Sequence, residues 1–345
     1  MQIPIENIYY LLCYAWNKLD EKDRVDVSID DKTELLDLFA KVLINATKIL
    51  LKRGIDKSYI DKTEELAGVK GKLQFSRTLK SNILFKQRTI CSFDDFSENI
   101  ISNRILVSTI YRLTRTNSLD KQLKYELVTL LRMLSNIEQI GITHSIFKKV
   151  RLNRNNHFYG FVMDVCQIIY ESTFPSEVQG QFKFSDFTRD DNKMNILFES
   201  FIRNYYKVEQ KKYNTVKKET IRWQFDKTET DSIQYLPIME TDITLENIEE
   251  KIIIDAKFYR ETMNLYYDRE KIKSTNLYQL FSYLLNQQDG NMKTQNATGI
   301  LLYPTITKDY DLEFHYKDHK IKIMTLNLNS NWRNISSRLN DIIGL

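Results

Sequence analysis

The alternation of apolar and polar positions is clearest between residues 239 and 259. Apolar and polar side chains alternate up to Leu245, and a nearly continuous apolar run, rich in isoleucine, occupies residues 251–259. A polar segment, residues 246–250, separates the two. Period-two alternation and a β-branched run on either side of a polar segment are typical of two strands joined by a turn. The pattern therefore predicts a β-hairpin.

The two faces of this hairpin select its register. With the turn centred between Ile248 and Glu249, one face is almost wholly apolar and pairs Ile243 with Ile254, Leu245 with Ile252, and Met239 with Phe258. The other face pairs Asp242 with Asp255, and Glu240 with Lys257. A shift of one residue would mix the faces, so we expect this register.

The predicted register places two carboxylates directly opposite each other, with Cβ atoms about 4.5–5.5 Å apart. Like charges in that position are destabilising, and a divalent cation relieves the repulsion. Mg²⁺ suits one or two carboxylates completed by water and phosphate, and Mn²⁺ is an alternative. Lys257 projects from the same face as Asp255, where its amine could orient or deprotonate water, or neutralise phosphate charge.

The competing interpretation is an ordinary hairpin with a solvated charged face. The near-continuous apolar strand argues against it, because Asp255 and Lys257 would then lie in a buried sheet, where unpaired charges are costly. We therefore treat Asp242, Asp255 and Lys257 as candidate catalytic residues, with the two aspartates as metal ligands.

Helical and strand periods predict the remaining elements. The expected helices are residues 3–19, 30–51, 76–82, 99–116, 119–134, 158–171, 192–207, 274–288 and 332–343. The expected extended segments are residues 59–75, 220–225, 299–303, 313–316 and 321–328. A strand, a helix and a strand in succession predict parallel pairing of residues 299–303 with 251–259. A domain boundary is expected near residue 150, where an arginine- and asparagine-rich segment begins.

Three helical side chains are further candidates. Glu199 lies at the edge of the apolar stripe of helix 192–207, either as a solvated residue or as another carboxylate near the metal. Gln279 and Tyr283 share one face of helix 274–288 by their i, i+4 spacing, either for packing or to hold phosphate or the lysine. Ser274 is the expected N-cap of that helix.

Composition and simple motifs narrow the function. A net charge of +4, from 50 basic and 46 acidic residues, does not by itself indicate nucleic-acid binding. Residues 68–72 lack the spacing of a P-loop, so we expect a turn between strands. His315 and His319 are expected at the surface. Three widely separated cysteines give neither metal-ligand spacing nor a disulfide framework, and no apolar stretch approaches about 20 residues, so we expect a cytoplasmic protein with no membrane span.

The order of the candidate residues resembles the PD-(D/E)xK nucleases, in their RecB-like branch with a Q-x-x-x-Y helix. It runs Glu199, Asp242, Asp255-Ala256-Lys257, Gln279, Tyr283. The sequence departs from the family pattern at Thr241, where the family has proline. The resemblance implies an α/β restriction-endonuclease-like domain with a central mixed sheet, and a metal ion held by Asp242, Asp255 and the Ala256 carbonyl.

Longer stretches resemble the McrC family, the nuclease subunits of McrBC restriction systems. They are IPIENIYYLLCYAW, GVKGKLQFSRTL, CSFDDFSENIISNRIL and METDITL…KIIIDAKFY…NLYQLFSYL. The resemblance implies an α+β domain, residues 1–150, that docks on an McrB-like AAA+ GTPase hexamer and stimulates it, followed by an endonuclease domain, residues 151–345. The implied substrate is double-stranded DNA carrying 5-methylcytosine.

Two other functions stay open. The chain could be a non-catalytic activator of the GTPase ring that only grips DNA, although the complete acidic pair with its lysine disfavours this. It could also be a RecB-like repair exonuclease, although the long N-terminal region lacks helicase motifs.

Overall fold

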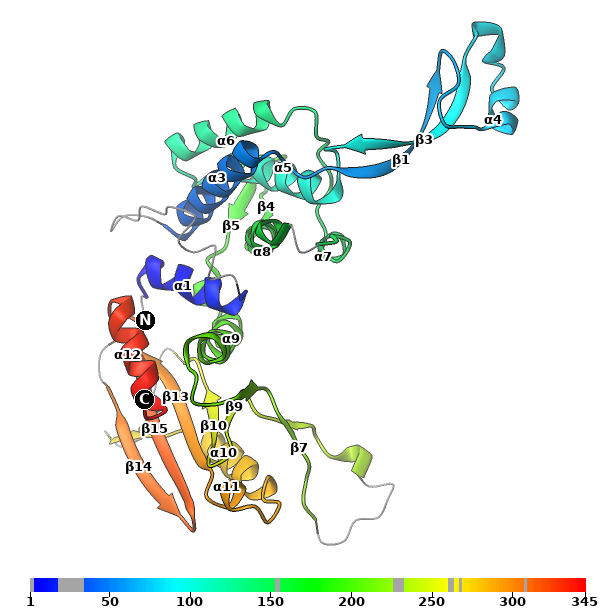
Figure 1. The fold of residues 1–345 in the computed structure, drawn as a ribbon. Helices are drawn as coiled ribbons and strands as arrows, with labels where there is room; N and C mark the ends of the chain where they lie inside the picture. The colour runs from blue at the N-terminus through cyan, green and yellow to red at the C-terminus, as the bar shows by residue number, and fades with distance from the viewer. Residues whose placement is uncertain are drawn as a thin grey trace. The chain divides into compact units, whose positions relative to one another are not determined.

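The computed structural model describes residues 3–17, 34–152, 156–225, 233–259, 264–266, 269–306 and 309–345 (Figure 1). The chain forms two compact units, which we call the sheet unit, residues 1–23 and 186–345, and the helical unit, residues 24–185. This division differs from the predicted boundary near residue 150. The reason is packing: α1 (Ile5–Ala15) contacts α9 (Asp191–Glu209) of the sheet unit, and α8 (His157–Glu171) contacts α5 (Ile101–Thr114) of the helical unit.

The helical unit combines amphipathic helices with small antiparallel sheets. Besides α5 and α8, its helices are α3 (Leu35–Arg53), α4 (Phe75–Lys80), α6 (Lys121–Met133), α7 (His144–Phe147) and the 3-10 turn η1 (Leu84–Lys86). Its strands are β1 (Ser58–Leu66), β2 (Lys72–Leu73), β3 (Thr89–Ser97), β4 (Thr173–Pro175) and β5 (Phe182–Phe184). The apolar stripes of α3, α5, α6 and α8 meet in one core.

Strands β1 and β3 form an antiparallel ribbon, with β2 added beside β3 (Figure 1). None of the β1 side chains is buried, so the ribbon has little core of its own. Residues 67–71 form a loop that leads into β2, in agreement with the predicted turn. Gly71 is required there because its φ is +68° and an added Cβ would lie 2.5 Å from the Ser92 carbonyl oxygen. The sequence pattern did not predict β3.

The sheet unit is built on a six-stranded mixed sheet with the order β14-β15-β13-β10-β9-β6. These strands are β6 (Thr215–Lys217), β9 (Ile243–Glu246), β10 (Lys251–Ala256), β13 (Thr298–Thr305), β14 (Asp311–Tyr316) and β15 (His319–Asn327). The predicted parallel pairing is confirmed, since β13 follows α10 (Ser274–Asn286) and lies parallel to β10. Helices α9 and α10 both contact β10, and α12 (Trp332–Ile342) contacts β15.

The predicted hairpin register is confirmed in the centre of the hairpin and wrong at its open end. Ile243 pairs with Ile254, and Leu245 with Ile252, as expected. The ladder stops there. The strand β8 (Met239–Glu240) pairs instead with β7 (Thr220–Ile221). The chain turns toward β7 because the Thr241 N–H donates to the Glu219 carbonyl at 2.9 Å, so Met239 does not face Phe258 and Glu240 does not face Lys257.

Two smaller expectations are also wrong. Ser274 is the first residue of α10 rather than its N-cap, which is Lys273, and no side chain caps that end. His319 is fully buried, because its ring nitrogens lie 3.0 Å from the Ala297 carbonyl oxygen and 2.8 Å from Gln288 Nε2. His315 is exposed, as expected. Among the helices that the structure describes, none combines the length and apolarity needed to span a bilayer.

Candidate active site

Asp255 is a buried carboxylate at the end of an apolar strand. Every residue of β10 is buried, and Ile253 packs in a core with Leu280, Tyr283 and Leu301. Side chains two residues apart on a strand point to the same face, so Asp255 extends from this core. Its side chain has no exposed surface, and neither carboxylate oxygen accepts a hydrogen bond of good geometry. Such a group requires a cation.

Asp242 reaches the same place from the bend before β9. Its Oδ2 accepts a hydrogen bond from the Ala256 backbone N–H at 3.0 Å, which ties the carboxylate to the strand that carries Asp255. Its backbone carbonyl lies 3.3 Å from Arg203 Nη1 on α9. The structure therefore brings the two predicted carboxylates together, although Asp242 lies just outside the ladder.

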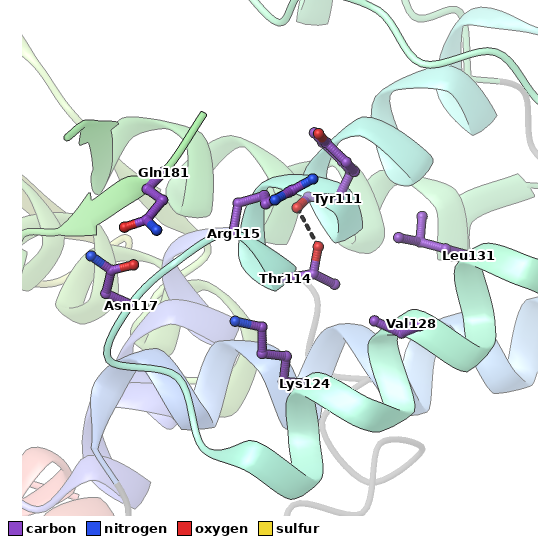
Figure 2. A pocket seen from close by; sticks show the side chains of 8 residues that line it. All are labelled: Tyr111, Thr114, Arg115, Asn117, Lys124, Val128, Leu131 and Gln181. Carbon is purple, nitrogen blue, oxygen red and sulfur yellow. Dashed lines mark hydrogen bonds between the residues drawn. The ribbon is translucent and has the colours of Figure 1, made fainter. Parts of the chain in front are cut away.

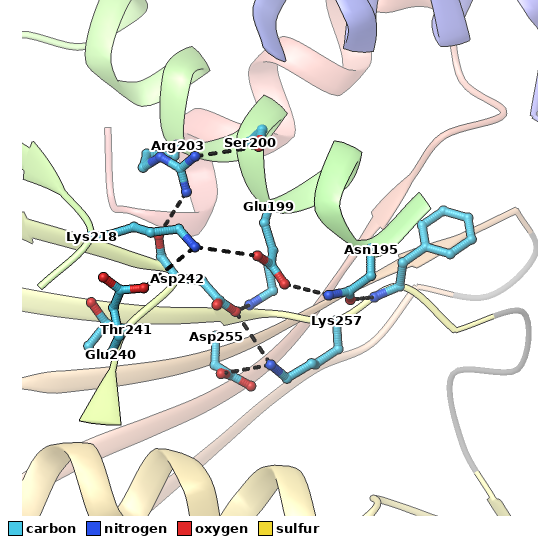
Figure 3. Close-up of polar contacts among 12 residues, drawn as sticks. Asn195, Glu199, Ser200, Arg203, Lys218, Glu240, Thr241, Asp242, Asp255 and Lys257 are labelled. Carbon is cyan, nitrogen blue, oxygen red and sulfur yellow. Dashed lines mark hydrogen bonds and ion pairs between the residues drawn. The ribbon is translucent and has the colours of Figure 1, made fainter. Parts of the chain in front are cut away.

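Lys257 lies between the two aspartates (Figure 3). Its Nζ is 3.1 Å from Asp255 Oδ1 and 3.5 Å from Asp242 Oδ2. Burial alone would lower the pKa of the Lys257 ammonium, but the charges of Asp255 and Asp242 outweigh burial and raise that pKa above its usual range. Lys257 is therefore a cation at neutral pH and donates hydrogen bonds rather than accepting a proton.

One ammonium does not balance the carboxylates around it. Burial raises the pKa of Asp255 to about 7, and the negative charge of Asp242 adds to this effect against the attraction of Lys257. Burial also raises the pKa of Glu199, and here the negative charge of Asp242 is the next largest cause. The three carboxylates thus interact electrostatically in a site of low solvent exposure, as expected for a functional cluster.

Glu199 approaches the pair from α9 through partners that the sequence pattern did not single out. Its Oε1 accepts a hydrogen bond from Asn195 Nδ2, one helical turn earlier, and its Oε2 lies 3.9 Å from Lys218 Nζ. Figure 3 shows Asn195, Lys218 and Arg203 around Glu199 and Asp242. The i, i+4 spacing of Asn195 and Glu199 was a readable signal. The contact of Arg203 with the Asp242 backbone depends on the tertiary fold.

Gln279 and Tyr283 form one hydrogen-bonded unit on α10. Gln279 Nε2 donates to the Tyr283 hydroxyl at 2.6 Å, and that hydroxyl donates to the Glu240 carbonyl at 2.7 Å. Burial raises the pKa of Tyr283 to about 12, with Asp255 as the next contributor, so the hydroxyl keeps its proton. This unit therefore holds the backbone two residues before Asp242.

A separate concavity lies in the helical unit (Figure 2). Its volume is about 380 Å³, and it is lined by Tyr111, Thr114, Arg115, Asn117, Lys124, Val128, Leu131 and Gln181. These residues include no carboxylate, histidine or cysteine. The candidate catalytic residues lie in the sheet unit instead.

Comparisons with known proteins agree with the resemblance seen in the sequence. The family model described as McrBC 5-methylcytosine restriction system component matches residues 6–304. The chain is 32% identical over 340 residues to the type IV methyl-directed restriction enzyme EcoKMcrBC of Escherichia coli strain K12, covering 99% of this chain and 97% of that protein.

The fold is also similar to a solved structure, the half-complex from a tetradecameric assembly of Thermococcus gammatolerans McrB AAA+ hexamers with bound McrC. The TM-score is 0.59 at 16% identity, covering 98% of this chain and 76% of the solved one. With a family model matching most of the chain and a relative of this identity over nearly its whole length, the chain belongs to the McrBC family of 5-methylcytosine restriction system components.

Proposed function

We propose that this chain is the DNA-cleaving subunit of a restriction system of this family, a metal-dependent endonuclease acting on double-stranded methylated DNA. The observation that carries the proposal is the cluster of Asp242, Asp255 and Lys257 at the open end of the hairpin. The six-stranded mixed sheet and the residue order support assignment of the sheet unit to the PD-(D/E)xK nucleases.

The donor set fits a hard divalent cation. The buried Asp255 carboxylate has the Lys257 ammonium beside Oδ1 but accepts no hydrogen bond of good geometry, and Asp242 faces the same ammonium. Asp242, Asp255 and the Ala256 carbonyl would therefore hold Mg²⁺ or Mn²⁺. Within the described part of the chain, no three His, Cys, Asp or Glu side chains form a complete metal cage, so water and phosphate would fill the remaining positions. The bound ion would supply Lewis acidity and lower the pKa of water.

The side chains around the metal site have separate roles in the proposed reaction. Lys257, as a cation, orients the attacking water and neutralises charge that develops on the phosphate. Glu199 accepts hydrogen bonds from water next to the metal ligands. Gln279 and Tyr283 fix the Glu240 backbone and so the approach of Asp242.

We assign docking on the GTPase ring to the helical unit. The segment that links β1 to β3 exposes several large apolar side chains: Val69, Phe75, Leu79, Leu84 and Phe85. Phe85 is the most exposed of these side chains, at 92%. Exposed apolar surface of this kind is typical of an interaction site. The partner would be an AAA+ hexamer like the McrB hexamers that bind McrC in the Thermococcus complex, and docking would stimulate its GTP hydrolysis.

Substitution of Asp255 tests the nuclease site. The Asp255→Ala protein is mixed with its ring partner, GTP and methylated DNA, beside an Asp311→Ala control on the exposed edge of the same sheet. We expect cleavage to be abolished while stimulation of GTP hydrolysis survives, and the control to cut normally. Normal cutting by Asp255→Ala would instead favour the non-catalytic activator, which grips DNA but leaves hydrolysis to another protein.

A second substitution tests the docking surface. Phe85→Ser should weaken binding to the ring and lower GTPase stimulation, because it removes the most exposed large apolar side chain of the segment. Binding is measured with the purified ring by analytical ultracentrifugation. Unchanged affinity, together with unchanged stimulation, would exclude this segment as the contact.

A further inference from the structure

Asn195 is an amide that joins two parts of the candidate active site (Figure 3). Its Nδ2 donates to Glu199 Oε1 on the same helix. Its Oδ1 accepts a hydrogen bond of 2.8 Å from the backbone N–H of Phe258, the residue after Lys257. One side chain therefore connects the carboxylate on α9 to the chain segment that leaves β10.

The two hydrogen bonds fix the orientation of this amide. A backbone N–H can only donate, so the atom of Asn195 that faces Phe258 must be the oxygen. The NH₂ group then points at Glu199. Rotation of the amide by half a turn would set donor against donor on one side and oxygen against carboxylate on the other. The Glu199 carboxylate thus meets one specific donor.

The segment around Lys257 is held from both sides. The Lys257 N–H donates to the Leu302 carbonyl of β13 at 3.0 Å, a backbone hydrogen bond that continues the parallel pairing by one residue. One residue later, Phe258 is held on α9 by the Asn195 bond, and its ring packs at 6.2 Å and 69° against Phe198. The chain therefore passes from the sheet to the helix across a single residue, and that residue is Lys257.

We propose that Asn195 is a positioning residue for DNA cleavage: it holds the Glu199 carboxylate and the backbone of Lys257 in one arrangement toward the same scissile phosphate. This inference rests on the proposed nuclease function. Asn195 touches neither metal nor DNA in this role. Residues that orient metal-site groups in this way typically contribute about 10- to 100-fold to metal affinity or activity.

The test compares Asn195→Ala with Asn192→Ala, an exposed asparagine on the same helix. We expect Asn195→Ala to lower kcat for cleavage about tenfold and to raise the half-saturating Mg²⁺ concentration about tenfold. It should also reduce the rise in Tm that Mg²⁺ causes in the absence of DNA. A purely structural asparagine would lower Tm with or without Mg²⁺ and leave the Mg²⁺ dependence unchanged, and that result would overturn the proposal.

Asn195→Asp keeps the test decisive if the alanine variant does not fold. Aspartate has the same shape and still accepts from the Phe258 N–H, but it presents an oxygen to Glu199. Cleavage at saturating Mg²⁺ should fall at least about tenfold, and a parental rate would refute the positioning role. Asp255→Ala runs in parallel. If Asp255→Ala cuts DNA normally, the nuclease assignment fails, and the proposed role of Asn195 fails with it. If Asp255→Ala does not cut but the Asn195 variants are fully active, only the Asn195 proposal is rejected.

Discussion

A lysine stands at each end of strand β10: Lys251 is its first residue, and Lys257 directly follows its last residue. The two lysines have different surroundings. Lys251 Nζ lies 2.9 Å from Glu219 Oε2, with only 5% of the lysine side chain exposed, and Lys217 Nζ lies 4.0 Å from the other oxygen of that carboxylate. Lys257, 14% exposed, lies within 3.5 Å of both Asp242 and Asp255. The carboxylate at one end of the strand has enough positive charge beside it, whereas the other end has an excess of negative charge.

The surroundings of the two lysines distinguish a structural ion pair from the proposed catalytic cluster. In a matched buried ion pair, the attraction between the two charges offsets the cost of removing them from water, so no further charged group is needed. The excess of carboxylates near Lys257 raises the pKa values of Asp255 and Glu199, burial being the larger cause in both. A proton on one carboxylate or an added cation would balance that end of the strand, as the proposed metal site requires.

Removal of each lysine in turn should produce the largest difference between the two ends of β10. Lys257→Met should reduce DNA cleavage by about 10²–10³-fold, because it removes a cation placed where negative charge develops. Lys251→Met should leave cleavage close to the parental rate. Lys257→Met should lose about 3–5 kcal/mol of folding stability, because it leaves the buried Asp255 carboxylate without its partner. Lys251→Met should lose less, because Glu219 is 20% exposed and keeps Lys217 beside it.

Cleavage assays under metal saturation and urea unfolding measure the two quantities separately. If folded Lys251→Met lost cleavage as completely as Lys257→Met, the two ends of β10 would not differ in kind. The distinction between balanced and unbalanced charge would then have no functional meaning.

The pH dependence of stability should differ between the native chain and Asp255→Asn. The folded pKa of Asp255, about 7, is above the unfolded value of about 3.9. Asp255 therefore keeps its proton to a higher pH in the folded state than in the unfolded state. Its contribution to folding stability is present at low pH and is lost as pH rises from about 4 to 7. The loss is on the order of 4 kcal/mol.

Urea unfolding in EDTA between pH 4.5 and 8 checks this. Asp255→Asn should show a flatter profile and be the more stable protein at pH 8. An identical slope in both proteins would mean that Asp255 is ionised throughout, and that Lys257 alone balances it.

Mg²⁺ should stabilise the folded chain through the same excess of negative charge. At about 100 times its dissociation constant, a ligand that binds only the folded state adds about 2.7 kcal/mol. Thermal unfolding with and without Mg²⁺ should show this gain in the native chain and little of it in Asp242→Asn. Asp311→Asn, at an exposed ion pair with Arg338, should keep the full gain. Equal gains in all three proteins would place the ion elsewhere.

Burial explains which parts of this site could be predicted from the sequence. The register of β9 and β10 was predictable because a sheet buried on both sides tolerates one pairing, and Ile243 opposite Ile254 fixes it. The parallel pairing of β13 followed from the strand–helix–strand order. The two aspartates could therefore be brought together without coordinates.

The ends of the elements could not be read in the same way. Met239 and Glu240 continue the alternation of β9, and that pattern is equally compatible with β10 or with the actual partner β7. The choice depends on a backbone bond between Thr241 and Glu219, far apart in the sequence. His319 likewise is buried by contacts with Gln288 and Ala297 that no local period encodes. Long-range hydrogen bonds decide these positions.

The smallest expected effect concerns the Tyr283 hydroxyl, which holds the unbalanced end from α10. Tyr283→Phe leaves the Glu240 carbonyl without its donor and Gln279 without its acceptor, at a cost of about 1 kcal/mol. Because Glu240 lies two residues before Asp242, cleavage should fall about fivefold. Tyr278→Phe, at a 67% exposed position of the same helix, should cut at the parental rate. Equal rates for both variants would show that Asp242 keeps its position through the Ala256 N–H alone.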